Sequence, residues 1–451
     1  MQLVAYGAQD IYLSGNPQIT FFKVVYRRHT NFAMESIGQI FNSTTDFGKK
    51  VSCIVPRNGD LIHKMYLEIK LPALKQDQPP VNTNEYCEWV HGIGNALIKS
   101  VSVLIGGQLV DKHYGEWLDI WGELTMDGNV RNGYDTMVGN YPYSTRDAVT
   151  SNARHPRTLY VPLQFWFNKY PGLALPLIAL QYHEVEIKVE FESIDKLTQT
   201  GPKSTGTNVG HPLAKDGSEA SMLSCRLFID YIYLDTDERR RFAQVSHEYL
   251  IEQLQHTGPS SLSAGQASER INLNFNHPVK SLHWVIQPTT YLQANSLDDI
   301  QEKPSSVSSP PTTEELQTQD DTGKNWGGNQ KTTYNVKKST DGKNDTFSTA
   351  KIMLNGHDRM AERDADYYRV VQNCQHMPNY PSKTIYTYSF CLNPAEHQPS
   401  GTCNFSRIDN AVMPLSFTSN QSEEDRVIKV FGINYNVLRI MSGMGGLAYS
   451  N

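Results

Sequence analysis

The most restrictive feature of the chain is the run HEVEIKVEF at residues 183–191. Its apolar side chains alternate with glutamate and lysine, the pattern of a strand with one face in a core and one in water. Further strand-like runs occur at 63–71, 101–113, 225–234, 271–275, 384–391 and 427–440. Many short strands in two halves of similar length predict an all-β protein of two-sheet sandwiches, of which the jelly roll is the commonest large form.

Two of these runs carry more specific expectations. In 101–113, Gly106 and Gly107 supply the positive φ angles that a tight hairpin turn needs. The run 225–234, CRLFIDYIYL, is apolar on both faces, which predicts a strand buried on both faces within a sandwich.

Helices are few. In the segment 115–126, Trp117, Trp121 and Leu124 form one stripe, which predicts a short amphipathic helix. The segment that begins at His357, HDRMAERDADYYRVVQ, predicts another helix of about three turns.

A third helical segment begins at Asp235, near the middle of the chain. Its N-cap is expected at Thr236 or Asp237, followed by the apolar positions Phe242, Val245 and Tyr249. It follows a strand where a connection between domains would fall. We therefore expect an N-terminal segment and first sandwich at 1–236 and a second sandwich at 237–451.

Two segments, 196–220 and 296–350, are polar. In the second, only 9 of 55 residues are hydrophobic. Such a segment buries too little apolar area to offset its ordering entropy, so both are expected to be long exposed surface loops.

Composition excludes several classes of protein. A net charge of -6 gives no long-range attraction to nucleic acid. The N-terminus has no signal-peptide pattern, and the longest apolar run, 172–180, is too short to span a bilayer. Six dispersed cysteines without CxxC spacing indicate free thiols in a reducing compartment, so we expect folding in the cytosol.

No P-loop, GxGxxG, HExxH or GxSxG motif occurs. Cys374 and His376 could donate two metal ligands, but no second pair lies at zinc spacing. Glu184 and Glu186 could act as a glycosidase pair, although alternate charges on a strand are more simply its solvated face or a subunit contact.

Basic clusters occur at 26–29, which includes Arg27 and Arg28, and at 239–241. Each could hold phosphate, but both are brief, so ion pairing or an interface is the favoured interpretation. Four matches to the N-glycosylation pattern, which we interpret as chance in the absence of a signal peptide, begin at Asn42, Asn344, Asn404 and Asn420.

The stretch QPSGTCNFSRIDNA, residues 398–411, resembles a catalytic loop because it contains Ser400, Cys403, Ser406, Arg407 and Asp409. Cys403 has no histidine close in sequence to activate it. The structural interpretation is a turn followed by a short strand, with Phe405 and Ile408 anchored and Arg407 free to pair with an acid.

The same stretch also resembles a signature of the major capsid proteins of large nucleocytoplasmic DNA viruses that infect algae and amoebae. Four further blocks, in order along the chain, are similar to that family: 7–36, 175–191, 237–255 and 431–451. The resemblance therefore spans the whole chain, with the polar loops its least similar parts.

This resemblance implies a double jelly roll, two consecutive eight-stranded sandwiches, in a structural protein without catalytic, metal or cofactor-binding residues. It implies homotrimers that form pseudo-hexagonal capsomers and tile an icosahedral shell over an internal viral membrane, together with minor capsid and penton proteins. Assembly is expected in the host cytoplasm, and the basic cluster at 26–29 is expected to point inward, toward acidic minor proteins or lipid headgroups. The alternatives are a minor capsid protein of the same fold and a two-sandwich carbohydrate-binding protein.

Overall fold

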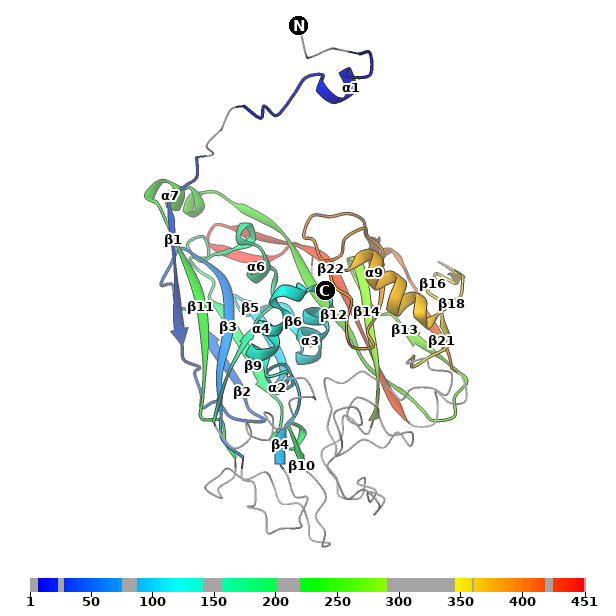
Figure 1. Ribbon diagram of the computed structural model, residues 1–451. Helices are drawn as coiled ribbons and strands as arrows, with labels where there is room; N and C mark the ends of the chain where they lie inside the picture. The colour runs from blue at the N-terminus through cyan, green and yellow to red at the C-terminus, as the bar shows by residue number, and fades with distance from the viewer. Residues whose placement is uncertain are drawn as a thin grey trace.

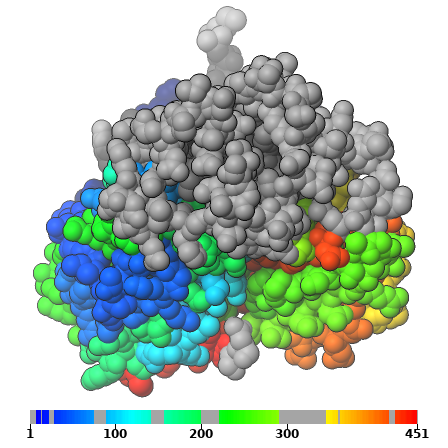
Figure 2. All heavy atoms as spheres, turned by 90° about the horizontal axis from the view of Figure 1, so that it is seen from below, coloured from blue at the N-terminus to red at the C-terminus, as the bar shows by residue number. Residues whose placement is uncertain are grey.

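The computed structural model describes residues 7–22, 28–74, 87–140, 156–200, 220–289, 345–358, 361–417 and 425–449. Two β-sandwiches lie side by side, and an N-terminal arm projects away from one end of the first (Figure 1). Seen along the strands from the opposite end, the first sandwich, blue to teal, adjoins the second, green to orange (Figure 2).

The first sandwich has the connectivity of a jelly roll. One sheet has the order β1-β11-β3-β7, and the facing sheet has the order β2-β9-β5-β6. Short pairs, β8 (Leu175–Pro176) on β3 and β4 (Cys87–Trp89) with β10 (Thr198–Thr200), extend it. Its eight main strands are β1 (Phe32–Gln39), β2 (Lys50–Ile54), β3 (Leu61–Leu71), β5 (Ile98–Ile105), β6 (Gln108–His113), β7 (Arg157–Pro162), β9 (Val185–Phe191) and β11 (Ser224–Leu234).

The second sandwich repeats this order. Its first sheet has the order β12-β22-β14-β19. In its second sheet, β21 pairs with β13 and with the two parts of a broken strand, β15 and β16. Strand β18 pairs with β15, and β17 pairs with β16. The bounds are β12 (His247–Leu262), β13 (Ser268–Asn272), β14 (Pro278–Pro288), β15 (Thr349–Ala350), β16 (Met353–Leu354), β17 (His357–Asp358), β18 (Arg363–Asp364), β19 (Tyr386–Ser389), β20 (Cys403–Asn404), β21 (Ala411–Ser416), β22 (Arg426–Met441) and β23 (Met444–Leu447). With the broken strands counted as one each, the prediction of two eight-stranded jelly rolls is confirmed.

Helices occupy the connections. In the described parts of the chain, no helix is both long and apolar enough to cross a membrane. The helices and helical turns are α1 (Ile11–Ser14), α2 (Ile93–Leu97), α3 (Gly115–Thr125), α4 (Gly128–Val138), α6 (Trp166–Lys169), η2 (Pro171–Leu173), η3 (Ile194–Lys196), α7 (Thr236–Gln244), η6 (Tyr367–Val371), α9 (Gln372–His376) and η7 (Phe405–Arg407).

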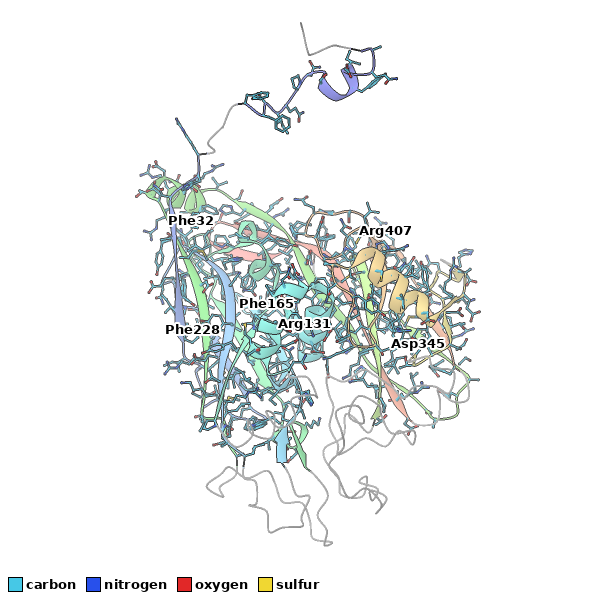
Figure 3. The ribbon with its side chains drawn as sticks, in the orientation of Figure 1. Phe32, Arg131, Phe165, Phe228, Asp345 and Arg407 are labelled. Carbon is cyan, nitrogen blue, oxygen red and sulfur yellow. The ribbon has the colours of Figure 1, made fainter. Side chains whose placement is uncertain are left out.

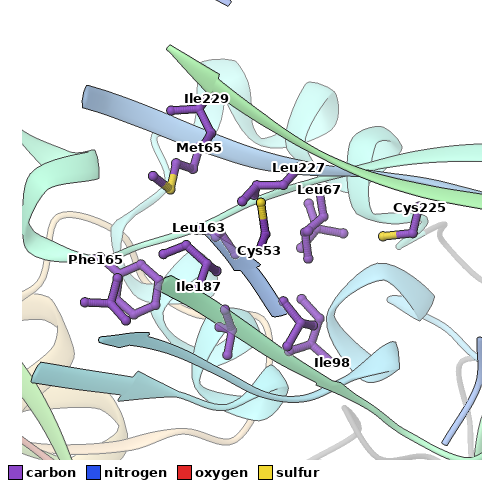
Figure 4. Packing of buried hydrophobic residues seen from close by; sticks show 14 of the residues in the cluster. Cys53, Met65, Leu67, Ile98, Leu163, Phe165, Ile187, Cys225, Leu227 and Ile229 are labelled. Atoms are coloured by element: carbon purple, nitrogen blue, oxygen red, sulfur yellow. The ribbon is translucent and has the colours of Figure 1, made fainter. Parts of the chain in front are cut away.

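The core of the first sandwich lies between its two sheets, as the close view of its packing shows (Figure 4). Cys53, Leu67, Ile187 and Leu227 meet there, each almost fully buried. Strand β9 alternates buried and half-buried positions along its whole length, which confirms the period-two prediction. The predicted hairpin also forms, with positive φ at Gly106 and Gly107.

The helix predicted from Asp235 is much shorter than expected. Its N-cap is Asp235 and not Thr236 or Asp237 as expected: the Asp235 side chain accepts from the Thr236 backbone N–H, and α7 ends at Gln244. Val245 and Tyr249 therefore lie outside it, and Tyr249 belongs to the long strand β12. Pairing of β12 with β22 along nearly all its length outweighs the helical propensity of this segment.

Three other expectations need correction. The helix expected from His357 begins at 365, because β17 and β18 occupy its first part. Strand β11 buries only one face, since it lies in an outer sheet whose second face is half exposed. The polar segments are not wholly exposed loops: Leu197 and Phe347 have no exposed surface, while 201–219 and 290–344 lie outside the described residues.

Candidate functional site

Helix α3 forms the joint between the two sandwiches (Figure 1). Its predicted stripe is confirmed, because Trp117, Trp121 and Leu124 are buried. They pack on the outer face of the second sandwich, against residues of β14 and β22 that include Phe431, whose ring centroid lies 5.5 Å from that of Trp117. Both tryptophans also contact the ring of His283, which is fully buried.

His283 is held in its neutral form at this joint. Burial lowers its pKa to about 3, and Lys280 nearby acts in the same direction. Its ring nitrogens form hydrogen bonds with Ser281 Oγ, at 2.9 Å, and Thr387 Oγ1, at 3.0 Å.

The opposite face of α3 is charged yet also buried, which sequence reasoning missed. Glu116 pairs with Lys429 of β22 at 2.7 Å, and Asp119 pairs with Lys383 at 2.7 Å. Glu123 accepts from Arg131 and from Ser382 Oγ. The 3- and 4-residue spacing of these acids was the available signal, because it places them on one helix face.

A second charged cluster also links the two sandwiches. Glu252 of β12 binds Lys280 of β14 at 2.5 Å and Lys169 of the first sandwich at 3.0 Å, while His397 Nδ1 lies 3.6 Å away. Burial alone would raise the pKa of Glu252, but Lys169, His397 and Lys280 hold it well below its usual range. The side chain of Lys280 has no exposed surface, so its charge depends on this carboxylate.

The outer face of sheet β1-β11-β3-β7 carries a cluster of partly exposed rings, here named the outer aromatic patch: Tyr66, Tyr160 and Phe228. The rings of Tyr66 and Phe228 stack with centroids 5.1 Å apart, and Tyr160 meets Tyr66 edge-on. Farther along the same sheet face, on β1, Phe32 is 59% exposed and Met34 48% exposed. Phe32 and Phe228 lie on the side of the molecule away from the second sandwich (Figure 3).

Gly38 of β1 makes room for this stacking. It pairs with Phe228, and a Cβ built at Gly38 would lie 3.1 Å from that ring. An apolar patch of this kind on a sheet surface is typical of an interaction site.

The side chains of 398–411 tie this loop to the second sandwich. Cys403 lies half-buried in β20, opposite Val279. Ser406 Oγ accepts from the His277 N–H at 2.8 Å, and Ser400 Oγ accepts from the Asn393 N–H at 3.2 Å. The short strand expected at 404–409 does not form, because β20 covers only Cys403–Asn404 and a helical turn, η7, follows.

The rest of this loop agrees with the anchored interpretation. Phe405 is buried, and Ile408 packs on the same core. The Asp409 backbone N–H donates to Asn355 Oδ1, and Arg407 is exposed at the surface (Figure 3).

Cys403→Ser is therefore expected to leave the fold intact. The substitution retains a small side chain in a half-buried position, so the free energy of unfolding should change by less than about 1 kcal/mol. Thermal unfolding of the variant beside the wild type measures this. A loss of several kcal/mol would contradict the assignment of this loop.

The other candidate residues that the sequence analysis weighed do not form a site in the described parts of the chain. Cys374 is exposed on α9, and His376 Nδ1 bonds to the Leu392 carbonyl at 2.9 Å. Glu186 pairs with Lys188 on the solvated face of β9. Within the described residues, no group of three or more potential metal ligands gathers.

The basic clusters and glycosylation matches lie only partly within the described residues. Arg239 pairs with Asp60 at 3.0 Å, as the ion-pair interpretation predicted. Of the cluster at 26–29, Arg27 lies outside the described residues and Arg28 is exposed. Asn344 and Asn420 also lie outside the described residues, and the Asn404 side chain accepts from the Ser406 N–H.

Comparison with known proteins gives consistent matches along the chain. Residues 20–235 match the model described as major capsid protein N-terminus, and residues 238–446 match the model described as large eukaryotic DNA virus major capsid protein. The major capsid protein of Pyramimonas orientalis virus is 46% identical, covering 100% of this chain and 99% of its own. That of Paramecium bursaria Chlorella virus 1 is 42% identical with the same coverage.

A solved structure shares the fold at similar coverage. A chain of the quasi-atomic model of the PBCV-1 virus capsid superposes with a TM-score of 0.73 and 37% identity, covering 96% of this chain and 100% of that one.

Proposed function

Because the chain belongs to the large eukaryotic DNA virus major capsid protein family, we propose that it assembles as a homotrimer whose six sandwiches form a pseudo-hexagonal capsomer. It is a structural component of an icosahedral virus capsid and not an enzyme. The trimer and its geometry are the proposed part.

The observation that carries the proposal is the repeat within the chain. Helix α3 follows β6, the fifth of the eight main strands of the first sandwich, and covers β14 and β22 of the second. The helical segment η6–α9 follows the broken strand β17/β18, the fifth of the second sandwich. In Figure 1 it lies on the side of the molecule opposite β1 and β11.

If the same packing is repeated between copies, η6–α9 of one copy covers β3 and β11 of the next. The surfaces fit this role, because Tyr66 of β3 and Phe228 of β11 form the centre of the outer aromatic patch, while Val371 and Tyr380 are exposed on the opposite side of the molecule, in and just after η6–α9. Such a head-to-tail contact uses two different surfaces and forms a closed ring when its rotation divides a full turn. With one copy supplying two sandwiches, three copies give six.

We also propose that the chain is organised as two units, 1–236 and 237–451. Strand β11 ends at Leu234 and β12 begins at His247, with α7 between them. Their cores are continuous at one place, since Ile251, Leu438 and Ile440 pack with the core of the first sandwich. The two units are therefore expected to unfold together.

The wider partners belong to the same proposal. Neighbouring capsomers, minor capsid and penton proteins and an internal viral membrane are the expected contacts, with assembly in the host cytoplasm. A net charge of -6 argues against a direct sequence-specific role with nucleic acid.

Light scattering of the purified protein, followed by electron microscopy of the same peak, tests the trimer. The expected mass is 153 kDa, three times the 51.0 kDa of the chain, with particles of pseudo-hexagonal outline. A monomer of 51.0 kDa at micromolar concentration would contradict it.

A further inference from the structure

The N-terminal arm, residues 7–22, presents large apolar side chains that contact little of the described body. Ile11, Tyr12 and Ile19 are mostly exposed, and Phe21 and Phe22 are 90% and 99% exposed. The arm projects beyond the end of the first sandwich that carries α7 (Figure 1). Consecutive exposed phenylalanines are unusual on a soluble surface and mark a segment that binds another surface.

A groove of matching character lies at the same end. It has a volume of about 530 Å³ and lies between α7, the start of β12 and the turn η2. This α7 groove is lined by the apolar side chains of Leu61, Pro171, Ala174, Phe242, Val245 and Tyr249. Its volume lies within the range of about 300–1,000 Å³ that is typical of ligand-binding pockets, which is enough for several side chains.

The charges of the two parts are complementary. Phe22 is followed by Lys23, Arg27 and Arg28, and Asp10 is the only acid between residues 7 and 31. The groove includes the carboxylates of Glu238 and Glu248 beside Arg241 and His247.

We propose that the arm of one copy inserts its phenylalanines into the α7 groove of a neighbouring copy in the trimer. The arm starts beside its own groove, because Phe32 pairs with Leu234 just before α7, yet it extends away from it. In a ring about an axis along the strands, every arm and every groove lies on the same end of the assembly. Phe22 lies ten residues before Phe32, so at about 3.3 Å per residue it can lie up to about 33 Å from the start of β1.

The inference rests on the proposed trimer and is tested by cross-linking between copies. Two differently tagged full-length proteins, both carrying Cys374→Ser to remove the exposed thiol, are co-expressed: one has Phe22→Cys and the other Val245→Cys. After mild oxidation, a disulfide-linked dimer containing both tags is expected. Val130→Cys on α4 replaces Val245→Cys as a matched control, since both valines are 54% exposed.

The mass of each mixture before oxidation separates the two proposals. A mass below 153 kDa would overturn the trimer itself. A trimer in which Val130→Cys and Val245→Cys cross-link equally would overturn only the arm contact. A single chain that carries both Phe22→Cys and Val245→Cys gives a further check. If its disulfide forms within the chain, the arm contact between copies is overturned, because the arm then occupies the groove of its own copy.

Deletion of residues 1–22 gives a second measurement that needs no cysteine. Loss of one buried phenylalanine corresponds to a roughly ten- to hundredfold weaker association. The trimer is expected to form but to dissociate at correspondingly higher protein concentration on dilution. Unchanged dissociation would overturn the contact.

Discussion

Phe228→Glu is expected to convert the trimer into a folded monomer. Phe228 stacks on Tyr66 at the centre of the outer aromatic patch and faces away from the core of its own sandwich. A carboxylate there leaves the internal packing of β11 unchanged. In the trimer it would be buried against the apolar surface of the next copy without a partner. Loss of an aromatic contact at the centre of an interface weakens the association by at least about 2 kcal/mol. The proposed trimer contains this contact three times.

Light scattering and thermal unfolding of the same sample measure this outcome. The expected mass is 51.0 kDa, with the circular dichroism of the wild type. Phe228→Leu serves as the control, because it retains an apolar side chain and should remain trimeric. A Phe228→Glu protein that stays at the trimer mass would show that this sheet face is not the subunit contact, and an unfolded one would show that the ring is needed within the sandwich.

Much of the fold could be predicted, because apolar and polar residues alternate along a sandwich strand that has one buried and one solvated face. Strand β9 alternates at every position, and the glycine pair at 106–107 fixes the hairpin between β5 and β6. Strand β12 could not be predicted in this way. Its residues between His247 and Gln255 have helical propensity, and only pairing with β22, which comes far later in the chain, makes them extended.

The surfaces proposed for assembly were harder to predict, since the sequence of a single strand does not show which of its two faces lies on the surface of the molecule. The run 225–234 is apolar on both faces, and this suggested complete burial. In the structure the second face, with Phe228, is half exposed, and the proposed contact with another copy would account for its apolar character. Helix α3 presents the converse case: an amphipathic helix usually turns its acids toward solvent, but Glu116, Asp119 and Glu123 are buried against cations.

Glu252→Gln is expected to destabilise the fold by about 3–5 kcal/mol, the usual cost of breaking a buried ion pair by removing one partner. The amide is nearly isosteric, so packing is retained, but the fully buried Lys280 and the nearby Lys169 lose their shared negative partner. Chemical denaturation at neutral pH measures the change. Glu248→Gln, on the same strand, is the matched control, because its pair with Arg439 is exposed and contributes at most about 1 kcal/mol.

The pH dependence identifies charge as the cause. The folded-state pKa of Glu252 is depressed, so its stabilisation is fully present above the ordinary glutamate pKa and is lost as the pH falls toward the folded-state value. The difference between wild type and Glu252→Gln should therefore be constant from about pH 6 to 8 and shrink below about pH 4, by up to about 1.4 kcal/mol per pH unit. An equal difference at pH 7 and at pH 3 would mean that Glu252 acts through its shape and hydrogen bonds rather than through its charge.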